Sequence, residues 1–141
     1  MSPSSQNSAP TRVLVVDDDL VQRRVIAKMA AQAGYEVAEA CSVAEAETCL
    51  AERPVDCVTV DIGLTDGNGA DLLHLVAEKC PRAQALIITG ASSGLLNDTL
   101  KVARENGTEI HDVFIKPLDL VGLRDSLRRA REASSVRGDA A

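Results

Sequence analysis

Short apolar runs alternate with longer stretches of helical periodicity along most of the chain. The run from Val13 to Val16 is apolar throughout, which is typical of a strand that is buried on both faces. From Leu20 to Ala33 the apolar side chains recur along one helical stripe, and Gly34 follows at a position that suits a helix C-cap. The same alternation predicts further strands at 36–40, 57–60, 85–88 and 113–115. It also predicts helices between Ser42 and Pro54, at 70–79, at 95–106 and from Asp119 to about Arg131.

Strands and helices that alternate in this way fold into one parallel sheet with helices on both faces. Because crossovers between parallel strands are right-handed, few topologies remain for such a chain. The 141 residues suffice for one domain of this kind, and we place it at residues 11–132. Residues 1–10 are rich in Ser, Pro, Asn and Gln, and we expect a disordered leader there and a disordered tail at 133–141.

The charge balance is acidic, with a net charge of −6 and a pI near 4.9. Proteins that bind nucleic acid usually present a basic face, so direct contact with DNA or RNA is not expected. No apolar run is long enough to cross a bilayer, and the N-terminus lacks the apolar core of a signal peptide. We therefore expect a cytoplasmic protein. The spacing of its four cysteines suits neither a zinc site nor a disulfide framework, which predicts free thiols.

Chemically reactive side chains stand where the predicted strands end. Asp17 and Asp18 follow the first strand, and Asp61 follows the third. Thr89 follows the fourth strand, and Lys116 follows the fifth. The strands of a parallel sheet all end at one edge, where such sheets bind their ligands. We therefore expect three carboxylates, a hydroxyl and an ammonium to meet there, although they lie far apart in the sequence.

The composition of this cluster indicates phosphoryl chemistry. Three neighbouring carboxylates repel one another unless a cation neutralises them. Their hard oxygen atoms suit Mg2+, which often shares a phosphate group with the protein. Lys116 and Thr89 could then hold the oxygens of a transferred phosphoryl group, while one carboxylate acts as the nucleophile. The pattern predicts a site at which an aspartate becomes phosphorylated.

At these residues the chain resembles the receiver domains of bacterial response regulators, which belong to the CheY-like superfamily. The similar segments, each after an apolar strand and in the family's order, are 13–19, 61–69, Thr89-Gly90 and Lys116-Pro117. The resemblance runs from about residue 12 to residue 131. It implies a doubly wound, flavodoxin-like (βα)5 fold, an α/β architecture with five parallel strands in the order 2-1-3-4-5.

The resemblance assigns a role to each residue that would contact the phosphoryl group. Asp61 would be the phosphoacceptor, and Thr89 and Lys116 would bind the transferred group. The backbone N–H groups of Gly63 and Gly90 would bind its remaining oxygens. The chain would catalyse only its own phosphorylation and dephosphorylation, as a regulatory domain and not as an enzyme with other substrates.

The resemblance also implies a metal site for Mg2+, or for Mn2+ in its place. Asp61 and Asp18 would bind the ion directly, and Asp17 would hold it through water. The backbone carbonyl of Gly63 would complete the protein's ligands.

The chain departs from the family's pattern in the loop after the phosphoacceptor and in the switch. Thr65 stands where most members have a proline. Val113 stands where receivers usually carry the Tyr or Phe that swings inward when Thr89 moves, and the neighbouring Phe114 should point to the opposite face. The stretch 107–116 is also longer than usual, as in a minority of receivers, some of which are joined to cyclic-dinucleotide phosphodiesterase domains.

The resemblance implies a sensor histidine kinase or a histidine phosphotransfer protein as the phosphodonor, and a downstream protein that the sequence does not identify. The sequence ends soon after the last predicted helix. We therefore expect a stand-alone receiver, either monomeric or a weak dimer on phosphorylation. It would act as a phosphoryl shuttle or bind its partner through the face around the fourth helix.

Two other functions remain open. The segment 17–19 resembles the D-x-D motif of haloacid-dehalogenase-type phosphatases, although Leu20 stands where that family has Thr or Val, and Asp61 has no role in it. The other alternative is a pseudo-receiver that binds partners without being phosphorylated. The five expected site side chains argue against it, whereas Thr65 and Val113 keep it open.

Overall fold

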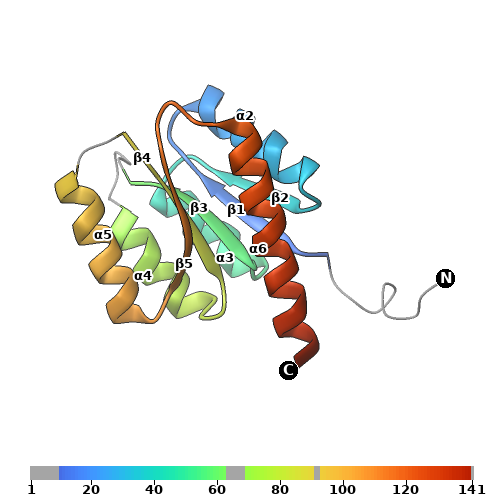
Figure 1. Cartoon of the computed structure of the whole chain (residues 1–141). Coiled ribbons are helices and arrows are strands. Elements are labelled where there is room, and N and C mark those ends of the chain that lie inside the picture. Colours follow the sequence, from blue (N-terminus) through green and yellow to red (C-terminus); the bar gives the residue numbers. More distant parts are fainter. Residues whose placement is uncertain (1–9, 63–68, 91–92, 141) are drawn as a thin grey trace.

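The computed structural model of the chain describes residues 10–62, 69–90 and 93–140. Figure 1 shows a central sheet with helices packed on both sides. The strands are β1 (Arg12–Val16), β2 (Glu36–Ala40), β3 (Cys57–Asp61), β4 (Gln84–Thr89) and β5 (Glu109–Ile115). The helices are α2 (Leu20–Gln32), α3 (Val43–Glu52), α4 (Gly69–Lys79), α5 (Ser93–Asn106) and α6 (Leu120–Ala140).

Neighbouring strands of the sheet pair in parallel, in the order β2-β1-β3-β4-β5. The predicted flavodoxin-like fold class is therefore confirmed. The chain winds outward in one direction from β1 to β2 and in the other from β3 to β5. The carboxyl ends of β1 and β3 thus lie side by side at the point where open parallel sheets bind their ligands.

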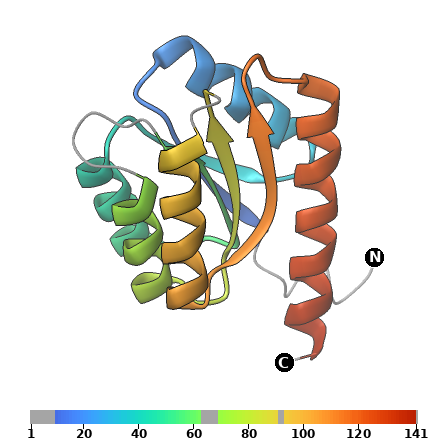
Figure 2. The same cartoon turned by 60° about the vertical axis from the view of Figure 1, so that its left-hand side comes forward.

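Each face of the sheet carries its own apolar core. Leu14, Val58 and Ile87 point to the face that α3, α4 and α5 cover. Val15 and Leu86, which alternate with them along the strands, point to the face of α2 and α6. Figure 2 shows the sheet between α6 and the group of α3, α4 and α5. Because both faces are covered, the central strands β1, β3 and β4 are buried along nearly their whole length and are mostly apolar.

Side chains cap the first turns of three helices, α2, α3 and α6. Ser42 Oγ accepts the backbone N–H of Glu45 at 3.1 Å, and the Glu45 carboxylate accepts the backbone N–H of Cys41 at 2.8 Å. This reciprocal pair is a capping box, and it fixes the start of α3 at the serine that the sequence indicated. Asp19 and Asp119 likewise accept backbone N–H groups from the first turns of α2 and α6.

The fifth strand is longer than its apolar pattern predicted. The prediction of 113–115 was too short, because the structure begins β5 at Glu109. The pairing of β5 with β4 passes over His111, which forms a bulge that takes up one residue of the long stretch 107–116. As an edge strand β5 keeps polar side chains at its start, so that part lacked the alternation by which a strand is recognised.

The last helix also continues beyond its predicted end. α6 reaches Ala140 instead of ending near Arg131, so residues 133–140, which we expected in a disordered tail, are helical in the structure. No Gly or Pro interrupts the sequence between Arg131 and Gly138, so nothing local stops the helix earlier. Within the described residues, no helix combines the length and the apolar character needed to cross a membrane.

The cysteines are free thiols, as their spacing predicted. Cys57 and Cys80 are buried, whereas Cys41 and Cys49 are half-buried. Burial raises the pKa of Cys57 to about 12, so this thiol is protonated at neutral pH and serves as a core side chain.

Candidate functional site

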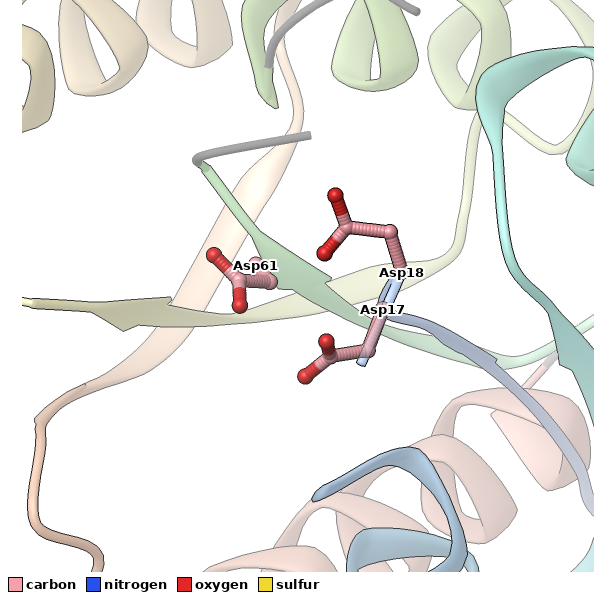
Figure 3. A group of neighbouring side chains, drawn as sticks. All are labelled: Asp17, Asp18 and Asp61. Carbon is pink, nitrogen blue, oxygen red and sulfur yellow. The ribbon is translucent and has the colours of Figure 1, made fainter. Parts of the chain in front are cut away.

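Three carboxylates meet where β1 and β3 end. Asp17 and Asp18 follow β1, and Asp61 is the last residue of β3, which pairs directly with β1. Each offers an oxygen atom, and these atoms lie within 4.8 Å of one another, as Figure 3 illustrates. Asp17 is fully buried and Asp61 is 6% exposed, whereas Asp18 is exposed. The predicted acidic cluster is present, with two of its charges inside the protein.

Lys116 reaches this cluster from the end of β5. Its ammonium nitrogen lies 2.8 Å from Oδ2 of Asp61, and its backbone N–H donates to the carbonyl of Thr89 at 2.9 Å. Burial pulls the pKa of Lys116 down, but the hydrogen bond to Asp61 and the charges of the three aspartates outweigh burial and raise that pKa. The lysine is therefore charged at neutral pH and bound to the carboxylate at the end of β3.

The surroundings of Asp17 disfavour the ionised form of its carboxyl group. Burial raises its pKa above the ordinary value, and the charge of Asp61 adds to the shift. Hydrogen bonds from Gln22 and Asp19, together with the charge of Lys116, lower the pKa without cancelling the rise. The Asp19 backbone N–H donates to Oδ1 of Asp17 at 2.9 Å, and the Gln22 amide donates to Oδ2. Both Asp17 oxygens thus have protein donors.

Gln22 is a site residue that the sequence analysis missed. Its Nε2 donates to Oδ2 of Asp17 and also to Oδ2 of Asp61, at 3.2 Å from the latter. A glutamine among the polar residues of a predicted helix gives no signal of its own. Its place in the first turn after an acidic strand end is the feature that could have indicated a contact with the acids.

The remaining predicted residues lie around the same edge or outside the described residues. Thr89 is buried at the end of β4, one residue beyond the pair that Asp61 forms with Ile88. Gly90 follows it and is exposed. Gly63, which was expected to bind both metal and phosphate, lies outside the described residues, as does Thr65.

The carboxylates fit a hard divalent cation. Mg2+ holds its oxygen ligands at about 2.0–2.1 Å, so ligands on opposite sides of the ion lie about 4.2 Å apart. The aspartate oxygens lie within 4.8 Å of one another, so a small inward shift gives that spacing. Burial and repulsion both disfavour the ionised form of Asp17, and a bound cation would offset both. Asp17, Asp18 and Asp61 could therefore hold Mg2+.

Comparison with known proteins places this geometry in a family. The sequence profile of the response regulator receiver domain matches residues 13–128. The chain belongs to the response regulator receiver family. The predicted resemblance is thereby confirmed, and this receiver has an acidic cluster at the carboxyl end of its sheet.

Individual relatives agree with the assignment. The transcriptional regulatory protein AruR of Pseudomonas aeruginosa is 37% identical over 140 residues, which cover 92% of this receiver and 54% of AruR. The chemotaxis protein CheY of Treponema pallidum is 33% identical over 117 residues, or 80% of this receiver and 77% of CheY. The solved signal receiver domain of an HD domain-containing protein from Pseudomonas fluorescens Pf-5 has a TM-score of 0.77 at 25% identity, covering 94% of this receiver and 98% of that domain. The receiver spans about half the length of AruR.

Val113 and Phe114 lie on opposite faces of the sheet, as the alternation of a strand predicts. Val113 packs against the core that α3, α4 and α5 cover, as Leu96 and Leu100 also do. Phe114 packs in the opposite core with Leu118. The ring of Phe114 is therefore held on the other side of the sheet from Val113.

Proposed function

We propose that this receiver accepts a phosphoryl group on Asp61 from a sensor histidine kinase or a histidine phosphotransfer protein. The observation that carries the proposal is the pairing of Asp61 with Lys116 beside two further acids. The ammonium lies 2.8 Å from Asp61 Oδ2, and oxygens of Asp17 and Asp18 lie within 4.8 Å of an Asp61 oxygen. A nucleophilic carboxylate, a fixed positive charge and ligands for a divalent cation are the groups that phosphoryl transfer requires.

In the proposed reaction an oxygen of Asp61 attacks the phosphorus of the donor phosphohistidine. The new P–O bond forms as the P–N bond breaks, and the donor imidazole departs. Lys116 stays beside the transferred group and neutralises charge on its oxygens. Mg2+, or Mn2+ in its place, would supply further positive charge when held by Asp18 and Asp61 directly and by Asp17 through water.

Three further residues complete the proposed site. The Thr89 hydroxyl would donate to a phosphoryl oxygen, and the backbone N–H groups of Gly63 and Gly90 would bind the others. The Gly63 carbonyl would join the metal ligands. The positions of Thr89 and Gly90 support this part, because β4 ends between the strand ends that carry Asp61 and Lys116. With Val113 at the switch, movement of Thr89 would be followed by an aliphatic side chain in place of an aromatic ring.

The setting of Asp17 argues against the phosphatase alternative. A D-x-D phosphatase would use this residue as its nucleophile, yet Asp17 is fully buried and both of its oxygens accept protein hydrogen bonds. The ammonium of Lys116 is bonded to Asp61 and not to Asp17. These contacts favour Asp61 as the residue that reacts.

We further propose that residues 11–132 form the receiver unit and that residues 1–10 are a leader outside it. The unit would work in the cytoplasm, where histidine kinases use ATP. It would act as a monomer or a weak phosphorylation-dependent dimer and would pass its signal to a downstream protein.

The proposal is tested by exposing the protein to acetyl phosphate with and without Mg2+ and measuring its intact mass. We expect one phosphoryl adduct that requires both Mg2+ and Asp61, with Asp61→Asn as the control. An adduct on Asp17 would instead revive the phosphatase. A folded protein that gains no adduct from acetyl phosphate or from any phosphohistidine donor would be a pseudo-receiver.

A further inference from the structure

The two buried acids of the site share one amide. Gln22 Nε2 donates to Oδ2 of Asp17 in a short hydrogen bond and to Oδ2 of Asp61 at 3.2 Å. The same Asp61 oxygen accepts the Lys116 ammonium at 2.8 Å. Gln22 is itself half-buried. One neutral NH2 group therefore lies between two carboxylates that would otherwise face each other.

The fold fixes this amide over the acids. Gln22 stands in the first turn of α2, where its backbone N–H is capped by Asp19 at 3.2 Å. The next residue, Arg23, donates to the backbone carbonyl of Asp17 at 3.0 Å and to Glu39 of β2 at 3.1 Å. The first turn of α2 is thus held to the ends of both β1 and β2, and a side chain from position 22 extends over the acidic cluster.

An NH2 group bonded to two carboxylates occupies the kind of position that a cation takes between them. Its two hydrogens carry partial positive charge, so it relieves some of the repulsion that the buried acids exert on each other. A divalent cation brings far more positive charge to the same oxygens. The hydrogens of the amide would then point at a like charge, so the amide must turn or withdraw when a cation binds.

We propose that the Gln22 amide occupies the position of the cation in the metal-free receiver, where it bridges Asp17 and Asp61. Because Mg2+ must displace this amide in order to bind, the apparent affinity for Mg2+ is weaker than it would be without Gln22. The inference rests on the metal-binding part of the proposed function. It makes Gln22 a positioning residue that holds the unloaded site together and competes with the ion that loads it.

Gln22→Met tests this role because it keeps the length of the side chain and removes both donors. We expect Mg2+ to bind at least threefold more tightly to Gln22→Met than to the wild type in isothermal titration calorimetry. Without metal the variant should have a lower melting temperature, because the acids lose their shared donor, and saturating Mg2+ should close this gap. Gln32→Met, the same change at the exposed far end of α2, is the matched control and should leave Mg2+ affinity unchanged.

Gln22→Lys tests the same idea in the opposite direction. A permanent ammonium between the carboxylates should neutralise the site and lower Mg2+ affinity at least tenfold. It should also raise the melting temperature in the absence of metal, because a full positive charge replaces a neutral amide.

Three results would overturn the inference. Weaker Mg2+ binding by Gln22→Met would make Gln22 a metal ligand through its carbonyl oxygen. Unchanged Mg2+ affinity, with the same loss of melting temperature at all Mg2+ concentrations, would make it a packing residue, and in both cases the proposed function would stand. Absence of Mg2+ binding in the wild type and in Gln22→Met would overturn the metal-binding part of the proposed function together with the inference.

Discussion

The two ends of the central sheet hold acidic side chains in opposite settings. At the carboxyl end, Asp17 and Asp61 are buried beside each other and accept hydrogen bonds from the side chains of Gln22 and Lys116, and Asp17 also accepts the backbone N–H of Asp19. At the amino end, the turns before β3 and β4 border a cavity of about 310 Å3 whose lining is partly apolar. At that end Asp56, the residue before β3, accepts the backbone N–H of Arg12, the first residue of β1, at 2.9 Å.

The difference shows how one functional group becomes structural or reactive. Asp56 accepts the backbone N–H of Arg12, which cannot move without unfolding the start of β1, so its carboxylate stabilises that strand. Asp61 binds an ammonium and an amide on flexible side chains, which can rearrange when a ligand arrives. In a parallel sheet the loops that follow the strands gather at one edge, so that edge is where exchangeable partners can collect.

The largest expected effect comes from making the same substitution at the two ends. Asp61→Asn should abolish the phosphoryl adduct formed with acetyl phosphate and Mg2+, because it removes the nucleophile. Asp56→Asn should keep the adduct, since its amide oxygen can still accept the backbone N–H. Intact mass gives the adduct, and circular dichroism checks that both variants are folded. A fully phosphorylated Asp61→Asn protein would contradict the assignment of the site.

A large but partial effect on phosphorylation is expected when the lysine ammonium beside Asp61 is removed. Lys116→Ala should slow adduct formation by about 100-fold, the usual cost of losing one group that stabilises developing charge. It should still bind Mg2+, because the three carboxylates remain. The rate is measured by mass against time and the binding by calorimetry, with the exposed Lys28→Ala as the matched control. An unchanged rate would show that Lys116 takes no part in the transfer.

A smaller effect is expected on stability when one buried charge is neutralised. The pKa of Asp17 is raised in the folded protein above its ordinary value of 3.8, so the stability that this group contributes is fully present below pH 3.8 and is lost as the pH rises through the raised value. In EDTA at pH 7, Asp17→Asn should therefore melt a few degrees above the wild type, and the gap should shrink toward pH 4.

Melting curves followed by circular dichroism between pH 4 and pH 7 give this comparison, and the exposed Asp98→Asn serves as the control. A gap that does not change with pH would mean that the charge of Asp17 is not the cause.

The smallest effect on phosphorylation is expected away from both ends, where β5 meets α6. The buried Ser126 hydroxyl donates to Asp112 Oδ2 at 2.8 Å. Ser126→Ala should lower the free energy of unfolding by about 1.5–3 kcal/mol, which is typical for a hydrogen bond to a charged group. Urea unfolding measures the loss, and the rate of adduct formation should match that of the wild type. A slower rate would link this contact to the switch.

Much of the fold could be predicted because its signals are local. The apolar runs of buried strands, the helical stripes and the caps at Ser42 and Asp119 depend on residues within one turn or one strand. The prediction fell short at β5 and α6, where those signals are weak. The polar start of an edge strand resembles a loop, and a helix that leaves the sheet has no apolar stripe to mark its length.

The sequence by itself determined the order of elements and which reactive side chains end the strands, because apolar runs and the residues after them are read directly from the chain. Only the tertiary structure decided how two neighbouring acids differ: Asp17 is buried, whereas Asp18 is exposed in the acidic cluster. It also decided that Gln22 bridges Asp17 to Asp61, a residue 39 positions away in the sequence. Burial and pairing of this kind arise when distant segments pack together, and the local periodicity of the sequence does not indicate which distant segments meet.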